Sequence, residues 1–316
     1  MNSSFYKRFS KRYIFSLLLR LSPYFIYHFL MIPYRRNIPE IGFKFSEQGR
    51  KHKRRVIALY DSMLNIFLEG YVEIMGEKVI PSTGQMLSLL FEMTLNLDEY
   101  LDKHRKTNDS LNIKNVLEKP SIKEQRDMFH SYLRLFGRDE SISSYLKDMF
   151  AAHYDHYIRL IGMDVGQESF EKTLEIAQMD NGRGYSSAGE IVRLFNLHQP
   201  NQNMLSQFYL LGMVGKFAED IVDLACDIQK GHLNLFRSLV KQHPDEKENL
   251  FRQVEYQTRI DLDWLNKNCH RTFVEYFSLM ESYYNQITFP KLRLVGDLLI
   301  VPVYIGDPDP EHHATS

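Results

Sequence analysis

Hydrophobic residues recur at helical spacing along most of this 316-residue chain, and this periodicity constrains the fold most. Apolar side chains repeat at i, i+3, i+4 and i+7, short polar breaks separate the segments, and no sustained period-two alternation precedes the C-terminus. Only the tail from residue 292 is expected to form strand or a docked irregular segment. The pattern predicts an all-α fold, with helices over 52–76, 84–107, 122–136, 142–161, 167–178, 187–197, 201–240, 245–268 and 270–286.

The chain has the size and composition to bury a full core, because 44% of its residues are hydrophobic. It contains no linker rich in Pro, Gly or Ser and no repeat with a period of 20–50 residues. We therefore expect one α-helical domain over 55–316, preceded by an extension over 1–54. Cys226 and Cys269 cannot form a disulfide framework, and they are expected to be reduced core thiols of a cytoplasmic protein.

Charge is distributed unevenly along the chain. Residues 1–55 contain thirteen Lys or Arg against two Glu, so the remainder carries a net charge of −12 within a total of −1. Between the basic clusters lies an apolar and aromatic stretch broken by Arg20, Pro23 and His28. This pattern suits a helix at the surface of an anionic membrane, and the alternative is an N-terminal helix packed on the domain.

Four carboxylates stand on one side of the segment 216–234, which the sequence predicts to be a single helix. Glu219, Asp223 and Asp227 are spaced at i, i+4 and i+8, and Asp220 lies on the same side. The intervening residues are almost all apolar, which is typical of a helix inside a bundle. Since like charges at this spacing repel and burial of an unpaired carboxylate is costly, the pattern predicts a cation there.

A second acidic group ends another strongly apolar stretch. Asp98 and Asp102 are spaced at i, i+4, with Glu99 beside them. If the two helices face each other, their oxygen ligands suit Mg²⁺, which keeps several waters and shares its coordination with substrate phosphates. The alternative is that both groups are ordinary helix surfaces, solvated or paired with Lys103, Lys216 or Lys230.

These two segments resemble the metal-binding motifs of the class I isoprenoid synthases. The stretch LDEYLD at 97–102 is similar to their aspartate-rich first motif, and EDIVDLACD at 219–227 is similar to their second motif. Within that superfamily, EYLD and DIVDLACDIQKGHLN are most similar to the bacterial large-terpene synthases. The resemblance implies a helical bundle with a central apolar cavity, three Mg²⁺ ions bound with the diphosphate of a prenyl substrate, and a terpene hydrocarbon or alcohol as product.

The chain departs from the family pattern at several positions. Glu219 stands where the second motif usually has Asn or Asp, so either Glu219 or Asp220 is the first ligand. Asp223 replaces the usual Ser or Thr, which keeps a prenyltransferase of the same fold as an alternative. The third hypothesis is a non-catalytic helical protein that binds lipid or membrane through its N-terminus. The candidate cations for gripping the diphosphate are Arg183, Arg193 and Lys230.

Aromatic residues can stabilise a carbocation. Candidates for the cavity lining are Phe91, Tyr185, Phe195, Tyr209, Phe217 and Tyr256. No nucleic-acid partner is expected, because the basic N-terminal clusters come with no recognised binding motif and the remainder is acidic.

Overall fold

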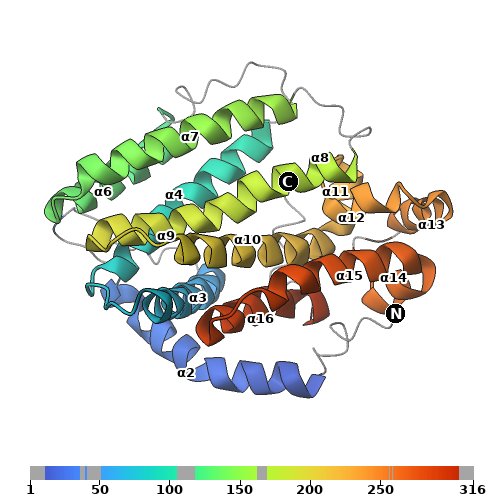
Figure 1. The fold of residues 1–316 in the computed structure, drawn as a ribbon, viewed down its shortest axis with the longest axis horizontal. Coiled ribbons are helices and arrows are strands. Elements are labelled where there is room, and N and C mark those ends of the chain that lie inside the picture. The colour runs from blue at the N-terminus through green and yellow to red at the C-terminus, as the bar shows by residue number, and fades with distance from the viewer. Residues whose placement is uncertain are drawn as a thin grey trace. The chain divides into compact units, whose positions relative to one another are not determined.

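The computed structural model describes residues 11–35, 40, 51–104, 118–161, 169–255, 257 and 259–305. Throughout these ranges the regular elements are helical (Figure 1). The prediction of an all-α fold is confirmed. The described chain groups into two compact units.

The first unit comprises residues 1–17, 158–186 and 202–316. Its central element is α10, which is apolar around nearly its whole circumference and packs against α15, α16 and a π-helical turn, η2. Local sequence sets several helix starts, such as Pro244 at the first position of α13 and Asp261, whose carboxylate caps α14. The helices are α8 (Phe170–Ala177), η2 (Gln178–Gly182), α10 (Gln202–Val222), α11 (Leu224–Lys230), α12 (Leu235–Val240), α13 (Pro244–Val254), α14 (Leu262–Asn268), α15 (His270–Asn285) and α16 (Pro290–Ile305).

The second unit comprises residues 18–157 and 187–201. In it α4 packs against α3 and α6. The buried hydroxyl of Tyr71 lies 2.9 Å from His198 Nδ1, which ties α3 to the residues that follow α9. Its helices are α3 (Lys51–Met75), α4 (Thr83–His104), α6 (Pro120–Leu135) and most of α7 (Asp139–Ile161), and the unit boundaries fall within α2 (Lys11–Arg35) and α9 (Arg183–Asn196).

Three predictions of secondary structure are wrong. The segment 245–268 is not one helix, because α13 ends at Val254 and α14 begins at Leu262. The segment 201–240 is not one helix, because α10 ends at Val222, α11 ends before Gly231 and α12 begins at Leu235. The described part of the C-terminal tail is not strand, because 290–305 form α16. The tail lacks a polar face, since helix α16 is mostly buried, and periodicity alone cannot reveal a helix of that kind.

The glycine-rich stretch 179–190 continues a helical run instead of interrupting it. Its residues 179–182 belong to the π-turn η2 and 183–190 belong to α9, so α8, η2 and α9 follow one another without a break (Figure 1). Two glycines allow this turn to contact α10. A Cβ atom on Gly212 would lie 2.2 Å from the carbonyl oxygen of Asn181, and one on Gly182 would lie 2.5 Å from the ring of Tyr209. The absence of side chains at both positions permits the close approach.

The predicted boundary after residue 54 and the predicted central apolar cavity stay predictions. Both cysteines are free thiols, as expected, and Cys269 is buried.

Candidate functional site

The second acidic stripe lies at a kink between α10 and α11, in the first unit. We call Glu219, Asp220, Asp223 and Asp227 the acidic kink. Asp223 has φ −92° and ψ 0°, outside the helical region, while helical hydrogen bonds on either side join Asp223 N to Glu219 O (2.9 Å) and Asp227 N to Asp223 O (2.8 Å). The helix is therefore interrupted at one residue and then resumes.

Asn234 explains the interruption. Its amide nitrogen donates to the Asp220 carbonyl at 2.7 Å, and this is the carbonyl to which the Leu224 N–H would donate in an unbroken helix. The same nitrogen donates to Asp227 Oδ2 at 2.8 Å, and the Asn234 side-chain oxygen caps α12 by accepting from Arg237 N at 3.1 Å. One buried amide thus fixes the kink, one carboxylate of the acidic kink and the start of the next helix.

A tight turn brings Asn234 back to the kink. Gly231 ends α11 in the left-handed conformation at φ 74°, and His232 N donates to Asp227 O at 2.8 Å. This is the Schellman arrangement, which glycine adopts without strain.

Asp220 is enclosed on all sides. Its side chain is 1% exposed, Oδ1 lies 2.9 Å from Lys216 Nζ, and Oδ2 accepts from Leu235 N at 2.6 Å. The positive end of α12 and one ammonium group therefore occupy both oxygens. Asp220 has no side facing solvent from which it could share a metal ion with a substrate.

Burial and charge act in opposite directions on this pair. Burial raises the pKa of Asp220 to about 7, although Lys216 opposes the shift. For Lys216, burial alone would lower the pKa, but the negative charges of Asp220 and Glu219 outweigh it and raise the pKa well above its ordinary value. Lys216 is therefore a fixed positive charge at the acidic kink at neutral pH.

The other three carboxylates are more accessible. The Glu219 side chain is 50% exposed and lies 3.4 Å from Lys216 Nζ, Asp223 is partly exposed, and the Asp227 side chain is 14% exposed. His232 Nδ1 lies 3.5 Å from Asp227 Oδ1. The sequence leaves Glu219 and Asp220 as alternatives for the first metal ligand of the second motif. Of the two, only Glu219 is exposed to solvent.

Other predicted site residues belong to α4, α9 and α11. Helix α4 includes Asp98, Glu99 and Asp102, but the structure does not describe their side chains. Arg183 is exposed at the start of α9, and Lys230 is partly exposed in the last turn of α11. Tyr256, a predicted lining residue, also lies outside the described residues.

Arg193 is engaged within the second unit. Its guanidinium binds Glu190 through two hydrogen bonds, at 2.6 and 2.8 Å, and donates to the His198 carbonyl at 2.8 Å. These contacts stabilise the C-terminal end of α9. They explain the presence of a cation at position 193 without any need for a bound diphosphate.

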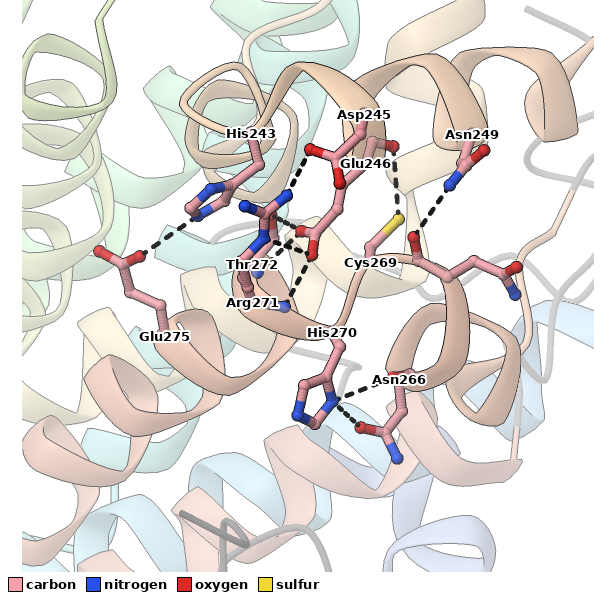
Figure 2. Close-up of polar contacts among 11 residues, drawn as sticks. His243, Asp245, Glu246, Asn249, Asn266, Cys269, His270, Arg271, Thr272 and Glu275 are labelled. Carbon is pink, nitrogen blue, oxygen red and sulfur yellow. Dashed lines mark hydrogen bonds and ion pairs between the residues drawn. The ribbon is translucent and has the colours of Figure 1, made fainter.

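A separate polar cluster joins α13 to α15 (Figure 2). The buried carboxylate of Glu246 accepts from the Thr272 backbone N–H (3.0 Å) and hydroxyl (2.7 Å) and from the Arg271 backbone N–H (2.8 Å). Burial would raise the pKa of Glu246, but these hydrogen bonds lower it. Arg271 also binds Asp245. Because the two backbone bonds saturate N–H groups in the first turn of α15, this cluster stabilises the fold.

Sequence reasoning missed Asn234, His232 and Tyr276 as neighbours of the acidic kink. The Tyr276 hydroxyl donates to the Phe217 carbonyl at 2.7 Å, and burial together with the charge of Asp220 raises the pKa of Tyr276. Only Asn234 carried a sequence signal, as a residue suited to capping the helix that follows it.

Within the described residues, no three His, Cys, Asp or Glu side chains gather into a group that could hold a metal ion. A magnesium site shared with a diphosphate does not require such a group, because Mg²⁺ is commonly bound by one or two carboxylates with waters and phosphate oxygens. The oxygen donors of the acidic kink are compatible with that kind of site.

No protein-family model matches the chain, and no curated protein matches it.

Proposed function

We propose that the protein is a Mg²⁺-dependent class I terpene synthase that ionises an allylic prenyl diphosphate and forms a terpene hydrocarbon or alcohol. The observation that carries the proposal is the difference in exposure among the four carboxylates of the acidic kink. Asp220 is buried and bound by Lys216 and Leu235, while Glu219, Asp223 and Asp227 keep the i, i+4, i+8 spacing on the accessible side.

In this proposal Glu219, Asp223 and Asp227 hold magnesium, and Asp98, Glu99 and Asp102 remain the candidate ligands of the first motif. The metal supplies the positive charge that neutralises the departing diphosphate. Lys216 adds a fixed charge behind the ligands, and Asn234 orients Asp227 through the 2.8 Å hydrogen bond to its Oδ2. Arg183 and Lys230 are the remaining candidates for binding the diphosphate, because Arg193 is held by Glu190.

Aromatic packing beside the kink is consistent with a site that shields a carbocation. Phe217, one residue after Lys216, is fully buried, and its ring centroid lies 4.9 Å from that of Tyr276 and 5.7 Å from that of Tyr283. Aromatic faces stabilise positive charge in places from which water is excluded.

Pyrophosphate release from purified protein, with parallel extraction of products, tests this proposal. Allylic prenyl diphosphates of increasing chain length are supplied with Mg²⁺ or with EDTA. A single new hydrocarbon or alcohol, formed from one substrate only when Mg²⁺ is present, is the expected result. Release that requires a second prenyl diphosphate would assign the protein to the prenyltransferases of this fold, and no release from folded protein would refute both.

Charge-neutral variants locate the site. Asp223→Asn and Asp227→Asn should each lower turnover by about a hundredfold or more, since each removes a carboxylate that binds the magnesium and so weakens stabilisation of the departing diphosphate. Asp148→Asn is the matched control, because Asp148 is an exposed aspartate on α7. Loss of turnover in all three variants, or in none of them, would contradict the assignment.

A further inference from the structure

Helix α2 exposes an apolar face that globular domains usually bury. Phe15, Leu19 and Leu30 are 64%, 57% and 60% exposed, and they lie on one side of the helix together with Leu18 and Ile26. A contiguous surface of this kind marks an interaction site.

The opposite face of α2 is packed within the protein. Ile14, Leu17, Leu21 and His28 are buried. In the second unit, the Tyr24 hydroxyl donates to Glu69 of α3 at 3.2 Å. The helix therefore has an inner face fixed by the fold and an outer face that is not covered by the described chain.

Tyr27 borders the outer face and is 48% exposed. A hollow of ≈ 300 Å³ opens beside it, lined by Pro23, Tyr24, Tyr27, His28 and Asn65. Tyrosine favours the boundary between lipid and water, because its ring is apolar and its hydroxyl is polar.

The charge of this segment selects one kind of partner. The first 39 residues contain seven Lys or Arg and no Asp or Glu. Two of these cations, Arg12 and Arg20, are exposed on α2 itself, next to the apolar face. An apolar face on a segment whose own charged residues are all positive is complementary to an anionic lipid surface.

We propose that α2 lies in the headgroup region of an anionic phospholipid membrane, with its outer face toward the acyl chains and Arg12 and Arg20 at the lipid phosphates. This proposal is independent of the enzymatic one, since none of these residues belongs to the acidic kink.

Lying on the membrane suits α2 better than crossing it. The helix is long and apolar enough over Arg12–Met31 to span a bilayer. However, Arg20 stands near the middle of that stretch, where a charge is costly, and the inner face is committed to the protein. On a membrane surface the arginine side chain reaches the headgroups without entering the hydrocarbon.

Vesicle co-sedimentation of the full chain tests the proposal. Vesicles of phosphatidylcholine are compared with vesicles of phosphatidylcholine mixed with phosphatidylglycerol, for wild type and for Leu19→Glu/Ile26→Glu. The matched control is Leu135→Glu/Leu197→Glu, which adds the same charge at two equally exposed leucines elsewhere, 51% and 64% exposed in the wild type. Circular dichroism verifies that each variant is folded.

We expect binding to the anionic vesicles alone, weakened at least about tenfold by the α2 variant and unchanged by the control. Arg12→Gln/Arg20→Gln should weaken binding about fivefold for each charge, and it decides the question if the glutamate variant does not fold. Absence of wild-type binding, or equal binding by all variants, would overturn the proposal. So would protein that resists extraction by carbonate, which would indicate a spanning helix, or a dimer without lipid that only the α2 variant dissociates.

Discussion

Replacing Asn234 by alanine should destabilise the first unit strongly, because this one side chain makes three hydrogen bonds. The variant leaves the Asp220 carbonyl without its 2.7 Å donor and Asp227 Oδ2 without its 2.8 Å donor, and it removes the cap of α12. An N-cap contributes about 1 kcal/mol, and a hydrogen bond to a charged group about 1.5–3 kcal/mol. With the unpaired buried carbonyl included, we expect a loss of about 4 kcal/mol in the free energy of unfolding.

Urea unfolding followed by the fluorescence of Trp264 measures this loss where it occurs, because the single tryptophan of the chain lies in α14, within the same unit as Asn234. Circular dichroism, recorded in parallel, reports on all the helices. Coincidence of the two transitions would show that the units unfold together.

Two controls separate the kink from a general effect of losing an asparagine. Asn249→Ala removes a single exposed hydrogen bond of 3.4 Å and should change the free energy of unfolding by less than about 0.5 kcal/mol. Asn234→Asp keeps the capping oxygen but places a second carboxylate beside Asp227, so its stability should recover partly at acid pH. A loss below about 1 kcal/mol in Asn234→Ala would refute the reasoning.

Three further predictions concern buried groups of the same unit. Glu246→Ala should lower the free energy of unfolding by about 3 kcal/mol at neutral pH, because it leaves Thr272 unpaired. This loss should shrink as the pH falls, because Glu246 then becomes protonated in the wild type. A loss independent of pH in urea unfolding would contradict this prediction. Asp220 has a pKa raised from 3.8 to about 7, so the folded state binds the extra proton between these values. The wild type should therefore lose stability relative to Asp220→Asn as the pH rises from 4.5 to 7.5 in the same assay, and a constant difference would show that the carboxyl is not perturbed. Gly212→Ala places a methyl group 2.2 Å from Asn181 O and should cost about 2 kcal/mol, seen as a lower melting temperature; an unchanged melting temperature would refute the close contact.

Most helices were predictable from the sequence, whereas α16 and the breaks within 201–240 and 245–268 were not. The periodicity continues through 216–234 because the kink at Asp223 changes the direction of the chain without changing which residues are apolar. Its cause, the Asn234 amide on the Asp220 carbonyl, joins residues 14 positions apart. Spacing rules treat a helix as isolated, so they cannot anticipate a donor that returns from a later turn.

The residue types of the acidic kink could be predicted, but their roles could not. The sequence identified all four carboxylates and left open whether Glu219 or Asp220 comes first. Only three-dimensional structure shows that Lys216 and Leu235 N enclose Asp220. In the same way, the sequence made Arg193 a candidate cation, and only the structure shows its two hydrogen bonds to Glu190.

The π-turn η2 makes the length of the chain between α8 and α9 critical. Removing one residue from 178–182 would convert the turn to ordinary α-helix and rotate α8 by about 100° about its axis. Thr173, whose hydroxyl lies 2.7 Å from that of Ser238, would leave its partner, and buried Phe170 and Ile176 would turn with it. Insertions and deletions are usually tolerated in exposed glycine-rich stretches, yet here a single lost codon would exchange the inside of a helix for its outside.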